Sequence, residues 1–344
     1  MSELIDSASA ESTTAHTHSP WRMSVAPMMD WTDRHCRFFH RLLSKNTLLY
    51  TEMVTTGALL HGDVPRHLDF NEQEHPVALQ LGGSEPADLA KAARQGEQWG
   101  YDEINLNCGC PSERVQRGAF GACLMNEAAL VAEGVKAMVD AVSIPVTVKH
   151  RIGIDKTESY AFVRDFVGTV SEAGCKVFLV HARNAWLKGL SPKENRDIPP
   201  LRYEMVYLLK QDFPHLTICI NGGIKTTAEV HAHLQHVDGV MIGREAYHNP
   251  FWLSEWDAAF YDDHSQQAIS RDEIEAQMCD YMARRAEQYQ TATHAISRHM
   301  LGLRHGTKGS RGWRQVWSDH RLKNESAYAV SALALAQLMP FQAA

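Results

Sequence analysis

The sequence has no apolar run of the roughly 18 residues that a membrane-spanning helix needs. Its N-terminus lacks the basic start and the apolar stretch of a secretory signal. Cysteine is scarce: there are 7, an odd number, and the only close pair, Cys108 and Cys110, has one residue between its members. We therefore expect a cytoplasmic protein with reduced thiols, no disulfide framework, no membrane partner and no bound metal.

Positive charge is also in short supply. Lysine and arginine number 34 against 41 acidic residues, for a net charge of -7. This balance argues against a nucleic-acid partner, because neutralisation of phosphates supplies most non-specific affinity. The charges are unevenly placed, however, because acidic residues crowd between 257 and 275, whereas seven basic residues further on are opposed up to residue 324 only by Asp319: Arg298, Arg304, Lys308, Arg311, Arg314, Arg321 and Lys323. The alternative of a nucleic-acid partner that binds a local basic face therefore stays open.

The length of 344 residues exceeds the roughly 250 that a large barrel domain typically takes, so we expect a second, smaller domain. Residues 1–20 are rich in Ser, Thr and Ala and have almost no large apolar side chains, which predicts a disordered tail. With 44% hydrophobic residues, the remainder has enough apolar surface for a core.

Strand-like and helix-like segments alternate over most of the chain. Short apolar or β-branched runs recur eight times: MSVAPM, LLYTEM, PVALQL, EINLNC, PVTVKH, VFLVHA, TICING and GVMIGR. Between most of them lie segments with helical spacing, such as 85–99, 126–142, 159–173 and 226–235. This pattern predicts an α/β fold, a (β/α)8 TIM barrel over residues 21–255, with a doubly wound open sheet as the alternative.

After residue 244 the pattern becomes helical only, with apolar positions at helical spacing in 274–289, 295–303 and 327–338. We therefore predict a small all-helical domain over residues 256–344.

Polar residues and glycines stand where the predicted strands end, which is where the active site of a TIM barrel forms. After the seventh and eighth strands, INGGIK and GVMIGREA supply glycines that let backbone N–H groups approach a phosphate, although tight turns alone could require them. Lys149 and Gln80 end two other strands and are suited to the ring of a reduced flavin. No G-x-G-x-x-G motif follows the first strand, so FMN is favoured over a tightly held dinucleotide.

Cys110 lies just beyond the fourth predicted strand, in a loop punctuated by Gly and Pro. A thiol held above a flavin can protonate one carbon of a C=C bond while its neighbour receives hydride. The alternative is a small buried apolar side chain without a chemical role.

Several of these motifs resemble the tRNA-dihydrouridine synthase family. They are APMMDWTDR, LQLGG, EINLNCGCPS, TVKHRIG, VHAR, INGGIK and GREAYHNP, and they cover most of residues 23–250. TEMVTTGAL and HARNAWLKGLSPKENRDIPPL are similar to the A-type bacterial enzymes, which act on uridines 20 and 20a of the tRNA D-loop. The chain departs from the family pattern at Cys108 and His150, where small residues are usual.

The resemblance implies roles for individual residues. FMN would be held by Pro27, Met28, Met29, Gln80, Lys149 and His181, with its phosphate at Asn221, Gly222, Gly223, Gly243 and Arg244. Cys110 would give the proton to C5 of uracil, and FMN would be reduced again by NADPH or NADH. Contacts with tRNA would come from Asn107, Lys193, Arg196, Arg311 and Arg314. Trp313 and Trp317, interleaved with the last two, suit stacking on bases.

Two rival functions stay open from the residues alone. One is an FMN-dependent oxidoreductase of the dihydroorotate dehydrogenase type, which reduces a C=C bond in a small molecule. The other is a barrel that binds tRNA without catalysis. The basic tail argues against the first, and the intact set of Cys110, Lys149 and the glycines argues against the second.

Overall fold

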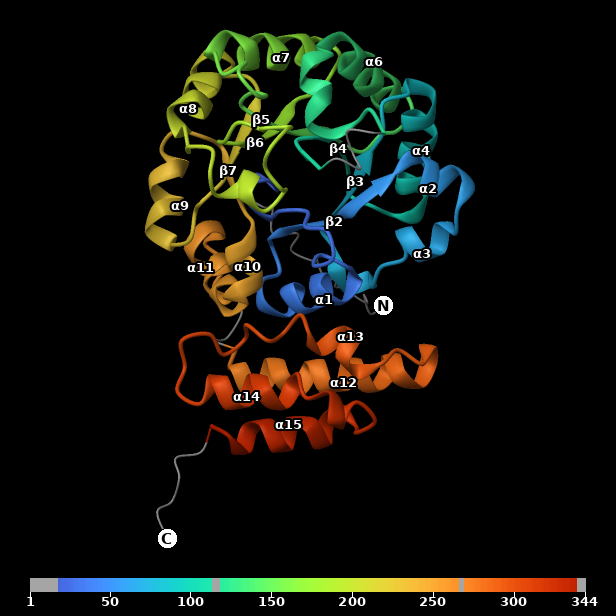
Figure 1. The fold of residues 1–344 in the computed structure, drawn as a ribbon, viewed down its shortest axis with the longest axis vertical. Coiled ribbons are helices and arrows are strands. Elements are labelled where there is room, and N and C mark those ends of the chain that lie inside the picture. The colour runs from blue at the N-terminus through green and yellow to red at the C-terminus, as the bar shows by residue number, and fades with distance from the viewer. Residues whose placement is uncertain (1–17, 113–117, 266–268, 339–344) are drawn as a thin grey trace, which may run out of the picture.

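The computed structural model describes residues 18–112, 118–265 and 269–338. Eight parallel strands pair in sequence order and the last pairs with the first, so the sheet closes into a barrel (Figure 1). This confirms the predicted TIM barrel and excludes the open sheet. The strands are β1 Met23–Val25, β2 Leu48–Thr55, β3 Val77–Gly82, β4 Glu103–Cys108, β5 Val146–Arg151, β6 Val177–His181, β7 Thr217–Asn221 and β8 Gly239–Ile242.

Helices surround the barrel (Figure 1). The four helical segments predicted between strands are confirmed as α4, α6, α7 and α9, each within three residues of its expected bounds. The helices of this part of the chain are α1 Arg34–Leu43, α2 Thr56–His61, α3 Val64–Leu68, α4 Pro86–Trp99, α6 Ala128–Val139, α7 Tyr160–Glu172, α8 Tyr203–Asp212, α9 Thr227–Leu234, α10 Arg244–His248 and α11 Trp256–Tyr261.

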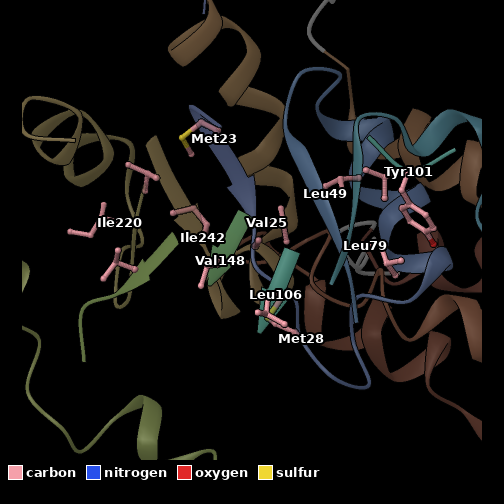
Figure 2. Close-up of a cluster of buried hydrophobic side chains, with 14 of the residues drawn as sticks. Met23, Val25, Met28, Leu49, Leu79, Tyr101, Leu106, Val148, Ile220 and Ile242 are labelled. Carbon is pink, nitrogen blue, oxygen red and sulfur yellow. The ribbon is translucent and has the colours of Figure 1, made fainter. Parts of the chain in front are cut away.

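Side chains of each strand alternate between two buried layers. Leu106 and Val148 point outward into the apolar layer between strands and helices, which Figure 2 shows in part. Their neighbours in sequence point into the barrel, where a smaller apolar cluster includes Tyr50, Leu179 and Met241. Polar side chains take the remaining inward positions, and these build the site described below.

Among the described residues, four more helices follow the barrel and lie alongside it, below α1 in the view (Figure 1). They are α12 Arg271–Tyr289, α13 Thr293–Ser297, α14 Ser310–Trp317 and α15 Ala327–Ala336. The prediction of a helix over 295–303 was wrong, because α13 ends at Ser297 and turns follow it. Gly302 lies against the backbone of Tyr247 and His248, where an added Cβ would come within 2.6 Å of the His248 carbonyl oxygen.

Asp33 connects the barrel with these helices. Its carboxylate caps the start of α1 by accepting the backbone N–H groups of His35 and Cys36. The other oxygen accepts Arg298 Nη2 at 2.9 Å and bonds the buried ring of His299 at 3.0 Å. Burial alone would raise the pKa of Asp33, but the hydrogen bond and charge of His299 and the backbone N–H of Cys36 hold it below its usual range.

The predicted division at residues 255 and 256 stays a prediction. Helix α11, just after it, bonds to the start of the barrel: Arg22 donates to the Phe260 carbonyl and Ser44 donates to Asp257. A disordered tail was predicted over residues 1–20, and residues 1–17 of it lie outside the described residues. Among the helices that the structure describes, none combines the length and apolar character needed to cross a membrane.

The helical segment is organised around one buried carboxylate, Glu275, whose residue is 1% exposed. The indole N–H groups of Trp313 and Trp317 donate to it at 3.0 and 3.1 Å, and Arg304 and Ser331 donate at 2.8 Å each. Arg304 is itself buried, so both charges of this ion pair are removed from water. Breaking such a pair leaves an uncompensated buried charge.

We predict that Glu275→Gln lowers the free energy of unfolding of the helical segment by about 3–5 kcal/mol. Asp272→Asn is the matched control, because Asp272 pairs with the same Arg304 but its side chain is 71% exposed; it should cost at most about 1 kcal/mol. Urea unfolding followed by tryptophan fluorescence measures both. Equal losses in the two variants would contradict the role given to Glu275.

Candidate active site

Two adjoining cavities open where the strands end. The larger, about 290 Å³, is bounded by the ends of β1, β5, β6, β7 and β8, and the smaller, about 100 Å³, contains Cys110. Four residues line both cavities: Pro27, Lys149, His181 and Arg196. Met28, Asn221, Gly222, Gly223, Gly243 and Arg244 line the larger one, and Met29, Gln80 and Asn107 line the smaller one. All eleven residues predicted for the cofactor therefore surround one connected mouth.

The glycines after β7 form one wall of the larger cavity. Gly222 and Gly223 have φ angles of 123° and 75°, which L side chains rarely adopt. An added Cβ on Gly222 would come within 2.8 Å of the His181 ring. On the opposite wall Arg244 reaches Asp197, with Nη2 to Oδ1 at 2.6 Å. The backbone here is shaped so that a ligand can approach it closely.

Positive charge exceeds negative charge at this mouth, since the two cavities are lined by Lys149, Arg151, Arg196, Lys225 and Arg244 but only by Asp197 and Glu245 among the described acidic residues. Within the described ranges Lys149 forms no ion pair, and its polar contact is with Asn221 Oδ1 at 3.4 Å. Burial lowers its pKa to about 7, and the charges of Arg151 and Arg196 act in the same direction. Burial, followed by the charges of Arg151 and Lys149, also holds the pKa of His181 well below its usual value. Such a group of cations suits an anionic ligand.

The residues present fit FMN on this observation. The molecule carries a phosphate, which the glycine wall and Arg244 can meet, and a ring that gains negative charge on reduction, which Lys149 can meet. The neutral His181 ring adds a polar group between the two.

The Cys110 loop is held at both sides by inward-pointing side chains. The side-chain carbonyl oxygen of Asn107 accepts the backbone N–H groups of Gly109 and Cys110, each at 3.0 Å. Arg151 donates to the Gly109 carbonyl at 3.0 Å and to the Asn184 and Asn195 carbonyls. Cys110 is half-buried, and its sulfur lies 3.6 Å from Ser112 Oγ.

The other cysteines differ from Cys110. Cys108, the last residue of β4, is fully buried in the outer apolar layer, where burial raises the pKa of its thiol, whereas Cys110 lies in the loop beyond the strand and lines the smaller cavity. Cys123 is half-buried and donates to the Phe120 carbonyl. His150, the other departure from the family pattern, is buried with its ring bonded to the Arg151 carbonyl.

The residues predicted to contact tRNA lie in three places. Asn107 and Arg196 line the mouth, and Lys193 lies exposed beside it, just before the short turn 194–196. Arg311 and Arg314 are exposed on α14, away from the mouth. The structure thus brings Asn107 and Arg196 together at the mouth and leaves Arg311 and Arg314 on the helical segment.

The expected basic face is smaller than the sequence suggested. Arg298 pairs with Asp33, Arg304 is buried against Glu275, and Arg321 pairs with Asp319. In the part of the chain that the structure describes, the four remaining cations form no ion pair: Lys308, Arg311, Arg314 and Lys323. The idea that Trp313 and Trp317 stack on bases was wrong, because they are 0% and 5% exposed and bond to Glu275.

Sequence reasoning gave no role to Arg151, which ends β5 and donates to the Gly109 carbonyl in the Cys110 loop. It missed the interior residues Glu103 and Thr147 altogether. The signal was present: in Glu103-Ile104-Asn105-Leu106-Asn107 the polar residues alternate with apolar ones, which places the polar set on one face of β4.

Comparison with known proteins gives consistent matches. The sequence model of the family described as Dihydrouridine synthase (Dus) matches residues 24–338. The chain is 58% identical over 320 residues to the tRNA-dihydrouridine(20/20a) synthase of Yersinia pestis, covering 93% of this chain and 92% of that protein. It is 61% identical over 308 residues to the same enzyme of Pseudomonas putida, covering 89% and 91%.

A solved structure of a 2-naphthoyl-CoA reductase in complex with 2-naphthoyl-CoA is similar in fold, with a TM-score of 0.54 and 12% identity. The likeness covers 70% of this chain and 50% of that chain. At this identity the match concerns the fold alone.

The buried lysine predicts a pH dependence for the FMN-free protein. The pKa of Lys149 is about 7 in the folded chain against an ordinary 10.5, so the folded state binds fewer protons between these values and stability rises with pH across that window. Lys149→Met removes this term. The variant should therefore melt above wild type near pH 6–7, and the difference should shrink towards about pH 10.

Differential scanning fluorimetry of FMN-free protein over that pH range makes the comparison. Lys225→Met, which removes an exposed lysine from the rim of the same cavity, controls for the loss of a cation. A melting difference for Lys149→Met that stays constant with pH would show that the lysine is not held in its uncharged form.

Proposed function

The chain belongs to the dihydrouridine synthase family, and we propose that it reduces uridine to 5,6-dihydrouridine at positions 20 and 20a of the tRNA D-loop. The observation that carries the proposal is the shared mouth, where the cation-lined cavity and the Cys110 cavity have Lys149, His181, Arg196 and Pro27 in common. A ligand in one cavity is therefore next to the thiol in the other. The names of the relatives supply the substrate.

FMN is the cofactor that we propose for the larger cavity. Asn221, Gly222, Gly223, Gly243 and Arg244 would hold its phosphate, and Pro27, Met28, Met29, Gln80, Lys149 and His181 would surround its ring. When bound, it supplies the hydride that saturates C6 of the uracil. Lys149 would stabilise negative charge on the ring edge, because its ammonium has no competing carboxylate among the described residues.

Cys110 is the proton donor in this proposal. Its thiol stands at the wall of the smaller cavity, and the bonds from Asn107 and Arg151 hold its loop in place. The thiol would give its proton to C5 of the uracil as C6 is reduced. Asn107, which lines the same cavity, would orient the base.

The remaining assignments complete the proposal. NADPH, or NADH, would reduce the cofactor between turnovers, and the reaction would take place in the cytoplasm, where tRNA is modified. Lys193 beside the mouth and Arg311 and Arg314 on α14 would contact tRNA phosphates. A small-molecule reductase on the same barrel has only the fold likeness in its favour.

Cys110→Ala tests the assigned proton donor. The variant should retain FMN and be reduced by NADPH at the wild-type rate, yet transfer to tRNA should fall by about 10²- to 10⁴-fold, the usual contribution of general acid catalysis. Stopped-flow absorbance separates the two half-reactions. Cys108→Ala and Cys123→Ala should lose far less, since neither thiol lines the mouth. Transfer at the wild-type rate in Cys110→Ala would assign the proton to another group.

Arg311→Ala/Arg314→Ala tests the tRNA surface. For every phosphate that the variant no longer neutralises, the slope of log K against log salt should become shallower by about 0.7–0.9, while FMN content stays unchanged. Arg66→Ala/Arg94→Ala, which removes two exposed arginines from the barrel helices α3 and α4, controls for net charge. Filter binding across a salt series measures both pairs. An unchanged slope in the first pair would place the tRNA surface elsewhere.

A further inference from the structure

A continuous line of hydrogen bonds runs through the barrel interior from its base to the Cys110 loop. Starting at the loop, Asn107 Nδ2 donates to Gln80 Oε1 at 2.8 Å, and Gln80 Nε2 donates to Asn105 Oδ1 at 2.7 Å. Asn105 Nδ2 then donates to Thr147 Oγ1 at 2.8 Å, and the Thr147 hydroxyl donates to Glu103. We call these four residues, Thr147, Asn105, Gln80 and Asn107, the amide relay. Each is at most 9% exposed.

The contacts at both ends of the relay require its hydrogen bonds to donate in the same direction, from Asn107 towards Glu103. At the base, Glu103 accepts three side-chain donors, Trp21 Nε1, Tyr50 OH and Thr147 OH, and an ionised carboxylate can only accept. At the mouth, Asn107 Oδ1 accepts two backbone N–H groups. Reversing the relay would turn the Asn107 NH2 group towards those two N–H groups, leaving buried donors without acceptors.

The direction decides what the cavity presents to a ligand. A primary amide has two N–H groups, and the relay uses one from Gln80 and one from Asn107. Both residues line the Cys110 cavity. Each therefore has one N–H left, which suits the carbonyl oxygens of a pyrimidinedione ring, a feature of both flavin and uracil.

We propose that Glu103 is a positioning residue for this site, acting through the amide relay to fix the amide orientation of Gln80 and Asn107 and thereby the conformation of the Cys110 loop. The identity of the ligands rests on the proposed function, but the orientation of the relay does not. Burial raises the pKa of Glu103 to about 7, and the three donors oppose that rise. The experiment is therefore run at about pH 8, where the carboxyl is ionised.

The test uses FMN-free full-length protein and needs no turnover. Millisecond hydrogen-exchange labelling with mass spectrometry reports the amides of Gly109 and Cys110. Glu103→Gln places an NH2 group among the three donors. Thr147→Val keeps the shape of the side chain but removes the hydroxyl that links Asn105 to Glu103. We expect exchange at the two amides to rise about tenfold in both variants, the ratio that corresponds to losing one hydrogen bond worth about 1.4 kcal/mol.

Tyr50→Phe is the matched control, because it removes a donor to Glu103 from an equally buried position but leaves the bond between Thr147 and Glu103. Its exchange should stay within about twofold of wild type. Wild-type exchange in both Glu103→Gln and Thr147→Val would overturn the proposal, as would equal acceleration in Tyr50→Phe, which would indicate general destabilisation.

A second readout connects the relay to the reaction. With FMN restored, Glu103→Gln and Thr147→Val should lower kcat for uridine reduction about tenfold, whereas Tyr50→Phe should stay near wild type. Accelerated exchange in a protein whose wild-type form does not modify tRNA would support the relay and refute the proposed function. Accelerated exchange with kcat unchanged in both variants would refute the positioning role.

Discussion

Polar groups fill much of the inside of this barrel, and those buried below the mouth need partners within the protein because they cannot reach bulk water. Closure of eight parallel strands makes alternate side chains point inward. Asn107, Gln80, Asn105 and Thr147 bond to one another in a line that leads from the mouth to the buried carboxylate of Glu103. Nearer the mouth two cations of β5 point inward: Arg151 donates to three backbone carbonyls, whereas Lys149 forms no ion pair within the described residues. We propose that the ligands bind on the side of the barrel where Lys149 lacks an ionic partner among the described residues.

The helical segment solves the same problem separately. The buried carboxylate of Glu275 accepts hydrogen bonds from two indoles, an arginine and a serine, and the indoles of Trp313 and Trp317 hold the apolar side of α14 against the interior. The consequence lies on the other side of that helix, where Arg311 and Arg314 remain exposed. Asp33 then bonds α1 to the turn after α13, so the barrel and the helical segment share a polar contact as well as an apolar one. The placement of the exposed arginines thus depends on buried carboxylates.

Much of this arrangement could be predicted from the sequence. The eight apolar runs predicted the barrel because strands buried on both faces read as continuous apolar segments. The residues at their ends, from Met28 to Arg244, were predicted as a site because a barrel places its site there, and the structure brings them to one mouth. Ion pairing could not be predicted, since Arg298 meets Asp33 across 265 residues and Arg304 meets Glu275 from a different helix. For the same reason Trp313 and Trp317, which looked like stacking platforms, proved to be core.

We infer that the protein reduces a uracil ring of tRNA at this mouth. The most direct test is mass spectrometry of nuclease fragments from unmodified tRNA incubated with the purified protein, FMN and NADPH. We predict that only the tRNA fragment that holds positions 20 and 20a gains the mass of two hydrogens. No gain of mass in any fragment, from a protein that binds FMN and oxidises NADPH, would contradict it.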